Sequence, residues 1–369
     1  MENYIVSARK YRPTTFDSVV GQQHITSTLK NAIKMGQLAQ AFLFCGPRGV
    51  GKTTCARILA KTINCTNLTE ETEACNECES CRSFNIGASM NIFELDAASN
   101  NSVDDIRDLV NQINIPPQTG RYKVYIIDEV HMLSSAAFNA FLKTLEEPPA
   151  YAKFILATTE KHKIIPTILS RCQIFDFKRI ENEDIVNHLR YVAEQEHIAY
   201  EPDALRIIAR KAEGGLRDAL STFDQLVSFT RGNLTRQGCL QNLNMMDSEC
   251  YFSLVDYFLK GDIAHALLFY QDAIVAKGFN GQHFLTGLCE HLRNLMVALD
   301  AATHKLLDVS ENERMRFGEQ AVTCGLPMLL KMLDIASDYE YRYREANNKT
   351  LFVEVCLMKL ASLKVQQPI

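Results

Sequence analysis

The sequence lacks any long hydrophobic run. No apolar stretch among its 369 residues approaches the ~18 residues that a helix needs to cross a bilayer. The first residues contain no apolar stretch after a basic start, so a secretory signal peptide is not indicated. These two absences predict a cytoplasmic protein without membrane partners, a compartment in which disulfides are uncommon.

Net positive charge is also missing. Lys and Arg number 39 against 44 Asp and Glu, which gives a formal charge of −5 at pH 7 and no global electrostatic footprint for nucleic acid. Any such contact would depend on a local basic surface, or on one assembled from several chains. Internal repeats, low-complexity segments and long flexible linkers are lacking as well. We therefore expect domains that pack together or pivot on short hinges.

The first half of the sequence alternates strand-like and helix-like segments. Short apolar runs bounded by polar or turn residues predict strands at 41–45, 91–95, 122–127, 154–158 and 173–177. Helical spacing lies between them, as at 53–63. Continuous apolar strands separated by helices favour a parallel sheet that is covered on both faces. The sequence therefore predicts the α/β class for this half.

The pattern changes at residue 179, after which every segment is predicted to be helical with short breaks. Three later stretches have amphipathic helical spacing: 253–259, 263–275 and 351–363. At roughly 100 to 200 residues per domain, the length allows two or three domains. We predict an α/β domain over 1–179, a small helical domain over 180–241 and a second helical domain over 242–369.

A glycine-rich segment between a predicted strand and a predicted helix is the strongest motif. It fits the pattern G-x-x-x-x-G-K-[ST] with the residues Gly46, Pro47, Arg48, Gly49, Val50, Gly51, Lys52 and Thr53. Glycines allow consecutive backbone N–H groups to surround an anion, and the following helix adds its positive end. We expect Lys52 to contact the β- and γ-phosphates of a nucleotide, and the Thr53 hydroxyl to ligate Mg²⁺.

A pair of carboxylates follows the apolar segment 124–127. We expect Asp128 to hold Mg²⁺ directly or through water, whereas Glu129 would polarise the attacking water. Such a pair often only ends a strand in solvent, but the phosphate loop favours the catalytic interpretation. The next strand ends in Thr158 and Thr159. Either hydroxyl could orient the water or sense the γ-phosphate, although β-branched residues also simply favour strands.

Clustered cysteines form a second motif. The spacing is C-x₉-C-x₂-C-x₂-C, with the residues Cys65, Cys75, Cys78 and Cys81. Four thiolates this close suit tetrahedral Zn²⁺ and leave no open position for water, so we predict a structural site. A redox-active pair and a set of buried apolar cysteines are the alternatives. The other cysteines lie singly in apolar surroundings and are expected in the core: Cys45, Cys55, Cys172, Cys239, Cys250, Cys289, Cys324 and Cys356.

Two arginines and two histidines also attract attention. Arg171 follows a helix-like segment, and Arg217 begins a helix in the second predicted domain. Either guanidinium could stabilise charge on a γ-phosphate of its own chain or of a neighbour. A surface salt bridge is the simpler interpretation of each. His24 and His131 have no spaced partner and are expected to be ordinary core or surface histidines.

Taken in this order, the motifs resemble a known family. The phosphate loop, the acidic pair, the two threonines, Ser170-Arg171-Cys172, Gly215-x-Arg217 and the cysteine insertion are similar to the AAA+ ATPase subunits, gamma or tau, of the bacterial DNA polymerase III clamp loader. The stretch 8–22 resembles the opening of that family. The resemblance extends clearly from about residue 4 to 241 and more weakly to the end. It implies a parallel-sheet AAA+ domain with a zinc-binding insertion at 65–81, an all-α lid and an all-α collar that oligomerises.

The resemblance implies roles that spacing does not. Arg171 would be an arginine finger that reaches the ATP of a neighbouring subunit, Arg217 a lid residue that contacts ATP in its own chain, and Thr159 the sensor at the strand end. The adenine and the phosphates would be held by residues of the N-terminal stretch and the phosphate loop: Tyr11, Val19, Val20, Gly21, Gly46, Pro47, Arg48, Gly49, Val50, Gly51, Lys52, Thr53 and Thr54.

The implied function is ATP hydrolysis within the DNA polymerase III holoenzyme. A pentameric ring of related subunits would use ATP and Mg²⁺ to open the sliding clamp and close it around primer–template DNA, which it would hold by the phosphates. The alternatives are a non-catalytic scaffold subunit of the same complex, or another AAA+ machine such as a branch-migration helicase or a protein remodeller. The tau form carries a C-terminal extension that binds polymerase and helicase. Because the sequence ends at Ile369, we expect the short form or a truncated long form.

Overall fold

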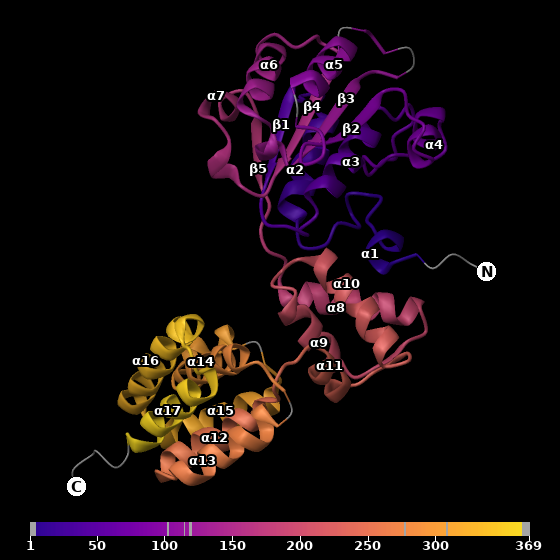
Figure 1. Ribbon diagram of the computed structural model, residues 1–369. Coiled ribbons are helices and arrows are strands. Elements are labelled where there is room, and N and C mark those ends of the chain that lie inside the picture. The colour runs from indigo at the N-terminus through magenta and orange to yellow at the C-terminus, as the bar shows by residue number, and fades with distance from the viewer. Residues whose placement is uncertain are drawn as a thin grey trace. The chain divides into compact units, whose positions relative to one another are not determined.

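The computed structural model describes residues 5–101, 103–113, 115–117, 120–276, 278–307 and 309–363. The ends of the first and third predicted domains, at 1–4 and 364–369, lie outside these residues. Contacts divide the chain into two compact units, Met1–Arg236 and Gln237–Ile369 (Figure 1). The first unit contains both the sheet and the small helical part that follows it. The division into three domains therefore stays a prediction.

A five-stranded parallel sheet forms the centre of the first unit, with strand order β2-β3-β4-β1-β5. The strands are β1 (Ala41–Cys45), β2 (Ile92–Asp96), β3 (Lys123–Asp128), β4 (Ala152–Thr158) and β5 (Gln173–Asp176). The helices and 3₁₀ turns around them are α1 (Ser7–Lys10), α2 (Gln23–Lys34), α3 (Lys52–Ile63), α4 (Glu79–Asn85), α5 (Val103–Ile113), η1 (Val130–Met132), α6 (Ser135–Glu146), η2 (Lys161–Lys163) and α7 (Pro166–Leu169). The parallel α/β sheet predicted from the apolar runs is confirmed.

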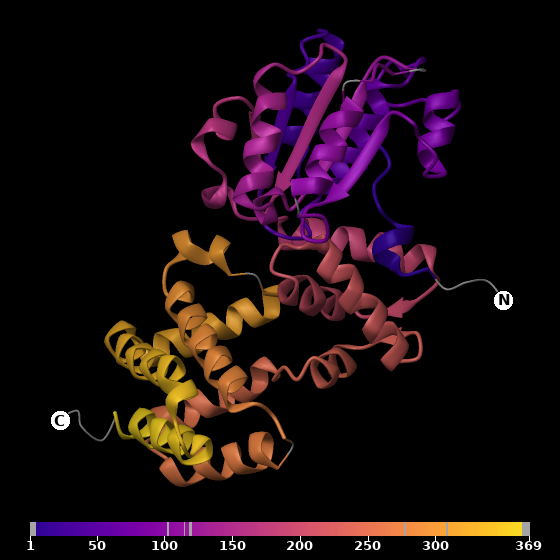
Figure 2. The same ribbon diagram turned by 45° about the horizontal axis from the view of Figure 1, so that its top comes forward.

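Alternate residues of the strands face two separate cores. Phe42 and Phe44 of β1 pack in one core with Leu59 of α3. Leu43, between them, packs in the other core with Phe141 of α6. Figure 2 shows helices on both sides of the sheet. Because the side chains of a strand point to opposite faces in turn, coverage on both faces explains why β1 is a continuous apolar run.

Helices α8 (Asn182–Gln195), α9 (Pro202–Lys211) and α10 (Leu216–Phe229) complete the first unit. The N-terminal helix α1 packs against α10, where Ser7 N donates to Asp224 Oδ2 at 2.7 Å. One detail differs from the expectation that strands end at 179. The two-residue strands β6 (Ala199–Tyr200) and β7 (Asn233–Leu234) pair in parallel.

The second unit is helical throughout its described residues. After α11 (Arg236–Asn242), its elements are α12 (Ser248–Lys260), α13 (Ile263–Tyr270), the π-helical segment η3 (Gln271–Val275), α14 (Gly281–Ala298), η4 (Ala301–Leu306), α15 (Glu311–Cys324), α16 (Leu326–Arg342), η5 (Tyr343–Glu345) and α17 (Lys349–Ser362). Phe252, Phe258 and Phe284 are almost fully buried in its core. The all-α prediction for this part is confirmed. None of the helices that the structure describes is long and apolar enough to cross a membrane.

Candidate functional site

The phosphate-loop segment leaves the carboxyl end of β1, at the edge of the sheet where β3 and β4 also end. Cys45 is in register with Thr158, and Gly46 N donates to Thr158 O at 3.2 Å. Ligands of open α/β sheets bind outside the carboxyl ends of the strands. A pocket of about 830 Å³ lies at this edge. Its size falls within the range of ligand-binding cavities.

Most of the residues expected to hold a nucleotide line this pocket. They are Tyr11, Val19, Val20, Arg48, Gly49, Val50, Gly51, Lys52, Thr53, Thr54, Asp128, Glu129 and Arg217. Among the described residues, five of the expected ones lie outside its lining: Gly21, Gly46, Pro47, Thr159 and Arg171. The structure therefore gathers the phosphate loop, the acidic pair and one lid arginine around a single space.

The phosphate loop adopts a backbone that its glycines permit. Gly49 and Gly51 have φ values of 76° and 103°, a region that residues with a Cβ rarely occupy. Lys52 Nζ donates to Gly46 O and Pro47 O, each at 2.8 Å. Burial lowers the pKa of Lys52, which is 6% exposed. Its ammonium group thus lies inside the loop, within reach of an anion bound there.

Thr53, the last residue of the phosphate-loop motif, lies beside Asp128, the last residue of β3. Thr53 Oγ1 donates to Asp128 Oδ2 at 2.6 Å, and Asp128 Oδ1 accepts a hydrogen bond from Glu129 N at 3.0 Å. Hydroxyl and carboxylate oxygens beside a phosphate loop are the ligands that Mg²⁺ takes in nucleotide sites. This donor pair therefore fits a magnesium ion that accompanies a nucleotide.

The Glu129 carboxylate is tied to the end of β4. Its Oε2 accepts hydrogen bonds from Thr159 N at 3.2 Å and from Thr159 Oγ1 at 3.0 Å. Glu129 has φ 46°, in the left-handed region that few non-glycine residues occupy. Backbone outliers of this kind cluster at functional sites, where surrounding contacts maintain them. Thr159 thus contacts a pocket residue, Glu129, without lining the pocket itself.

His131 lies beside the acidic pair. Its side chain is 8% exposed, with Nδ1 3.0 Å from Thr158 Oγ1 and 3.4 Å from Glu129 Oε2. Its Nε2 lies 3.5 Å from Glu160 Oε2. The imidazole therefore lies between two carboxylates and the buried Thr158. This nearly buried ring agrees with the expectation of an ordinary core or surface histidine, and it is not among the residues that line the pocket.

Arg12 is a pocket residue that the sequence analysis did not predict. It lines the pocket, and its Nε donates to Thr54 Oγ1 at 3.2 Å. Burial lowers the pKa of Arg12, and the nearby guanidinium groups of Arg57 and Arg217 lower it further. Positive groups that repel one another beside a phosphate loop favour a bound polyanion. Arg12 falls in the N-terminal stretch that resembles the family, and this was the signal available from sequence.

The two predicted arginines occupy different places. Arg217, at the start of α10, lines the pocket, and its backbone N donates to Gly49 O at 3.4 Å. A Cβ on Gly49 would lie 3.2 Å from Gly215 Cα, so the lid approaches the phosphate loop closely. Arg171 pairs with Glu146 at 2.8 Å, with 34% of its side chain exposed. It lies outside the pocket of its own chain.

Tyr11 and Gly21 border the pocket differently from each other. The Tyr11 hydroxyl donates to an oxygen of Glu196, just after α8, and burial together with this carboxylate raises the pKa of Tyr11 to about 12. Gly21 has φ 70°, and a Cβ there would lie 2.9 Å from Ile180 Cγ2. Tyr11 therefore lines the pocket, whereas Gly21 lies outside the lining and allows the chain to approach Ile180, which lines it.

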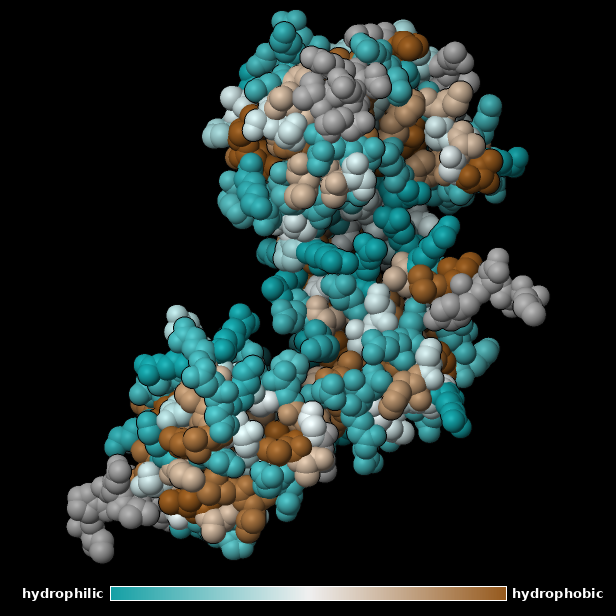
Figure 3. Space-filling view, in the orientation of Figure 1, coloured by the Kyte–Doolittle hydropathy of each residue, from teal (hydrophilic) through white to brown (hydrophobic). Residues whose placement is uncertain are grey.

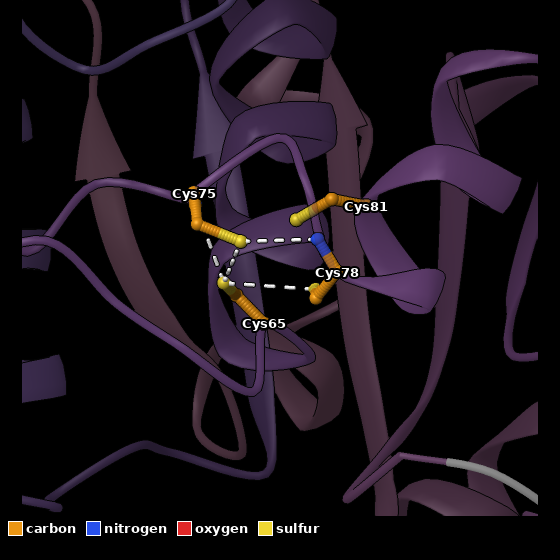
Figure 4. Close-up of side chains that lie close together, drawn as sticks. All are labelled: Cys65, Cys75, Cys78 and Cys81. Atoms are coloured by element: carbon orange, nitrogen blue, oxygen red, sulfur yellow. Dashed lines mark hydrogen bonds between the residues drawn. The ribbon is translucent and has the colours of Figure 1, made fainter.

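The four clustered cysteines converge (Figure 4). Their Sγ atoms all lie within 4.8 Å of one another, with Cys65 Sγ 3.5 Å from Cys75 Sγ and 4.0 Å from Cys78 Sγ. Four sulfurs at about 2.3 Å from a tetrahedral Zn²⁺ would lie about 3.8 Å apart. The donor set therefore fits four-coordinate zinc with no position left for water.

Backbone N–H groups point at these sulfurs. Cys75 N donates to Cys65 Sγ and Cys78 N donates to Cys75 Sγ, each at 3.3 Å. Burial opposes ionisation of Cys78, but backbone hydrogen bonds from Thr66 and Cys81 lower its pKa to about 6. Burial raises the pKa of Cys65 and of Cys81. Because thiolates this close repel one another, a cation is needed for all four to ionise together.

The remaining cysteines divide into two groups. The expectation of core positions is confirmed for those that are buried: Cys45, Cys55, Cys239, Cys324 and Cys356. It is wrong in part for the others, which are only half-buried: Cys172, Cys250 and Cys289. Isolated apolar neighbours in sequence do not reveal which face of a helix or turn points to solvent.

Three family models match consecutive parts of the chain. The model described as DNA polymerase III, delta subunit, matches residues 21–181. The model described as DNA polymerase III clamp loader subunit, ATPase lid domain, matches residues 184–232. The model described as DNA polymerase III subunits gamma and tau domain III matches residues 240–368.

Curated relatives agree with these matches. DNA polymerase III subunit gamma of Buchnera aphidicola subsp. Baizongia pistaciae is 38% identical over 320 residues, which are 87% of this chain and 86% of that protein. DNA polymerase III subunit tau of Bacillus subtilis is 39% identical over 369 residues, 99% of this chain and 64% of that protein. The tau subunit of Escherichia coli K12 is 43% identical over 302 residues, 81% of this chain and 46% of that protein. The chain thus spans about half to two-thirds of the length of these tau subunits.

Among solved structures, the RuvB Holliday junction branch migration motor of Thermotoga maritima has a TM-score of 0.49 and 19% identity, over 69% of this chain and 80% of that one. The gamma subunit of Buchnera aphidicola matches this chain over most of both lengths. The chain therefore belongs to the gamma/tau family of DNA polymerase III subunits.

Proposed function

We propose that this chain is an ATP-hydrolysing motor subunit of a DNA polymerase III clamp loader. The observation that carries the proposal is the pocket at the carboxyl edge of the sheet, where Lys52, the Thr53–Asp128 pair and Glu129 meet. Phosphoryl transfer to water needs a cradle for phosphates, ligands for a metal and a group that activates water. This pocket contains residues suited to each of the three tasks.

The phosphates of ATP would bind at the N-terminus of α3, where loop N–H groups and Lys52 meet them. Thr53 and Asp128 would hold Mg²⁺, which neutralises charge on the β- and γ-phosphate oxygens when it is bound. Arg12 and Arg217 add positive charge to the same lining. Their guanidinium groups would contact phosphate oxygens of ATP bound in the same chain.

The adenine would lie beside the N-terminal stretch. Tyr11, Val19 and Val20 line the pocket and offer an aromatic and apolar surface for a flat base. Gly21 is not among the lining residues, so its contribution would be backbone geometry. Gly46, also outside the lining, would act through the backbone of the phosphate loop.

Glu129 would accept a proton from the attacking water. Its carboxylate is held by the N–H and the hydroxyl of Thr159. A γ-phosphate near the end of β4 would compete for these two donors and free the carboxylate to orient water. Thr158 is fully buried, and its hydroxyl faces His131. These contacts favour Thr159 as the sensor.

Arg171 would act on a neighbouring subunit. The residue is partly exposed, lies outside the pocket of its own chain and pairs with the exposed Glu146. An arginine finger supplied in trans stabilises charge on the transferred phosphoryl group. Hydrolysis would then depend on how the subunits are arranged, so ATP would favour the assembled state that opens the clamp.

The cysteine cluster would bind one structural zinc ion per chain. Cys65, Cys75, Cys78 and Cys81 supply four sulfurs at compatible spacing. A site with four thiolate ligands has no open position for substrate or water. Its contribution would be to the folding of the insertion between α3 and β2.

The partners would be other clamp-loader subunits in a pentameric ring, the sliding clamp and primer–template DNA. Exposed apolar side chains on α15 and α16 support subunit contacts through the collar: Met315, Val322, Leu326 and Leu330. Hydrophobic areas are visible on this second unit in Figure 3. DNA would be held by its phosphates on basic surface assembled from several chains, because the net charge of one chain is −5. Polymerase and helicase tethering is not assigned to these residues.

Neither alternative function is favoured. A scaffold subunit has no need for Lys52, Thr53 and Asp128 to meet beside Glu129 in one pocket. A branch-migration helicase or a protein remodeller is not favoured by the family models, which match polymerase III subunits along most of the chain.

ATP turnover by the reconstituted assembly tests the proposal. We expect sliding clamp and primed DNA together to stimulate turnover more than either alone. Replacing Lys52→Ala in this chain should remove the stimulation, because the phosphates lose their ammonium contact. Turnover that clamp and primed DNA together leave unchanged would refute the clamp-loader function. Turnover that survives Lys52→Ala would refute the assignment of the pocket.

A further inference from the structure

The segment 65–81, here called the cysteine loop, contains a buried acidic side chain that has no part in the proposed hydrolysis. Glu73 lies between Cys65 and Cys75, and its side chain is 8% exposed. Carboxylates are rarely buried to this extent unless they are paired. The partners of Glu73 therefore indicate its role.

Both carboxylate oxygens of Glu73 hold the N-terminal stretch. Phe16 N donates to Oε2 at 3.0 Å, and Asp17 N donates to Oε1 at 3.1 Å. Lys30 of α2 lies 2.8 Å from Glu73 Oε1 and 2.6 Å from Asp17 Oδ1, which balances the charge. Hydrogen bonds to an ionised carboxylate are stronger and more directional than neutral ones. Glu73 thus fixes the backbone at Phe16 and Asp17.

The backbone that Glu73 holds continues into the wall of the nucleotide pocket. Phe16 is 1% exposed in the core beneath α3, and Val19 N donates to Phe16 O at 3.2 Å. Val19 and Val20 line the pocket. A shift of the backbone at Phe16 would therefore move this wall.

A second contact joins the cysteine loop to the phosphate-loop helix. Asn76, between Cys75 and Cys78, accepts a hydrogen bond from Lys61 Nζ at 2.6 Å. Lys61 is 4% exposed and belongs to α3, which begins at Lys52. The loop thus contacts both the N-terminal wall and the helix that carries the phosphate loop.

The cysteine loop has little else to order it. Thr69 and Glu73 close one turn, in which Thr69 N donates to Glu73 O and Glu73 N donates to Thr69 Oγ1, each at 3.0 Å. The local apolar cluster contains only Cys65, Ala74 and Cys81 as buried members. A cluster this small cannot order a loop by burial alone, so a metal that binds the sulfurs would supply much of the order.

We propose that the metal-bound cysteine loop is a support for the nucleotide pocket. Zinc fixes the loop, Glu73 in turn fixes Phe16 and Asp17, and the wall formed by Val19 and Val20 is then preorganised for the nucleotide. This inference rests on the proposed zinc and ATP sites. Glu73 is a positioning residue, because it contacts neither the nucleotide pocket nor the four sulfurs.

Amide hydrogen exchange in the chain of 369 residues tests the support directly. Elemental analysis of reductively purified protein should find about one zinc per chain. Chelation under reducing conditions should speed exchange at the Phe16 and Asp17 amides by about 10-fold or more, as expected for a local opening. The amide of Ile126 in β3 is the internal reference and should not change. Unchanged exchange at Phe16 and Asp17, or protein without zinc, would overturn the proposal.

Nucleotide affinity gives a second readout. Glu73→Gln should raise the Kd for a fluorescent ATP analogue roughly 3- to 10-fold, the effect of weakening one charge-assisted hydrogen-bonded pair, with zinc content unchanged. Glu71→Gln is the matched control, because Glu71 is exposed in the same loop. Chelation should raise the Kd of the wild-type chain, and the effects of chelation and Glu73→Gln should be less than additive, since both weaken the Glu73 contact.

The outcomes separate this inference from the proposed function. Wild-type affinity in Glu73→Gln, or additive effects of chelation and substitution, would overturn the support role. A wild-type chain that binds no ATP analogue would instead refute the ATP site. The exchange experiment would then still decide whether the cysteine loop holds Phe16 and Asp17.

Discussion

At the scale of single residues, the proposed hydrolysis depends on the Glu129 carboxylate. Glu129→Gln retains the shape of the side chain and an oxygen that accepts from Thr159, but it removes the base. We expect turnover to fall roughly 10²- to 10⁴-fold, the usual contribution of a general base, while ATP affinity stays near the wild-type value. Phosphate release measures the first quantity, and titration with a fluorescent ATP analogue measures the second.

The exposed Glu147, just after α6, supplies a matched control. Glu147→Gln should hydrolyse ATP at the wild-type rate. A Glu129→Gln variant with wild-type turnover would show that another group activates water. A large loss of affinity in this variant would show that Glu129 shapes the pocket more than it serves the chemistry.

Arg171 permits a test of action between subunits. Arg171→Ala breaks an exposed pair with Glu146, which is worth about 1 kcal/mol or less, so stability should hardly change. We expect turnover of the assembled ring to fall about 10-fold or more, with no change in the nucleotide affinity of the isolated chain. Arg190→Ala, which removes another exposed arginine hydrogen-bonded to Asn187, is the control. Weaker nucleotide binding by the isolated Arg171→Ala chain would contradict the role in trans.

The sequence could predict the parts of the site that are encoded locally. The segment 46–53 carries its function in its order and its glycines, and an acidic pair after an apolar strand has a fixed place in a parallel sheet. Arg12 and Glu73 are different. Arg12 meets Thr54 at a separation of 42 residues and Glu73 meets Phe16 at a separation of 57. No periodicity records such contacts, so only the folded chain reveals them.

At the scale of elements, the length of the apolar pattern decides whether a helix or strand can be predicted from sequence. Strands β1, β3 and β4 and helix α3 could be predicted because their apolar pattern continues for four residues or more, whereas β2 and β5 were predicted from shorter apolar runs. Strands β6 and β7 have two residues each and carry no period. The predicted helix 263–275 is interrupted by the π-helical segment Gln271–Val275. A change in hydrogen-bond spacing leaves the amphipathic pattern almost unaltered, which explains this miss.

Helix α14 carries a buried histidine whose effect on stability can be worked out. The ring of His291 lies edge-on to Phe252 with 4.6 Å between centroids, and its Nε2 is 3.4 Å from Gln320 Oε1. Burial lowers the pKa of His291 from 6.5 to about 4. The folded second unit therefore holds this ring neutral at a pH where the unfolded chain would protonate it.

Acid should destabilise the second unit through His291. Below pH 6.5 and down to about 4, the unfolded chain binds a proton that the folded chain does not. The free energy of unfolding should thus be unaffected by His291 above pH 6.5 and fall below it, by up to about 1.4 kcal/mol per pH unit. His291→Leu should flatten this slope in calorimetric melts, whereas His283→Leu, at an exposed position of α14, should keep it. An unchanged slope in His291→Leu would assign the acid sensitivity to other groups.

On the scale of the whole molecule, the chain contains two units with separate cores. The cores of the first unit cover both faces of the sheet, and the core of the second lies among its helices. The pocket and the cysteine cluster belong to the first unit, whereas His291 belongs to the second. Nucleotide and zinc should therefore act on the first unit, whereas His291 makes the second unit sensitive to acid.

Calorimetry of the chain of 369 residues tests this separation. We expect two unfolding transitions, one for each unit. Mg²⁺ and a non-hydrolysable ATP analogue should stabilise only the first unit, and should raise its free energy of unfolding by about 2.7 kcal/mol at 100 times the Kd. Lys52→Ala should abolish this stabilisation, and zinc chelation should lower the melting temperature of the first unit. Lowering the pH from about 7 to 5 should lower the melting temperature of the second unit, because His291 is held neutral there. A single transition that moves as a whole would show that the two cores unfold together, and nucleotide binding would then stabilise the second unit as strongly as the first.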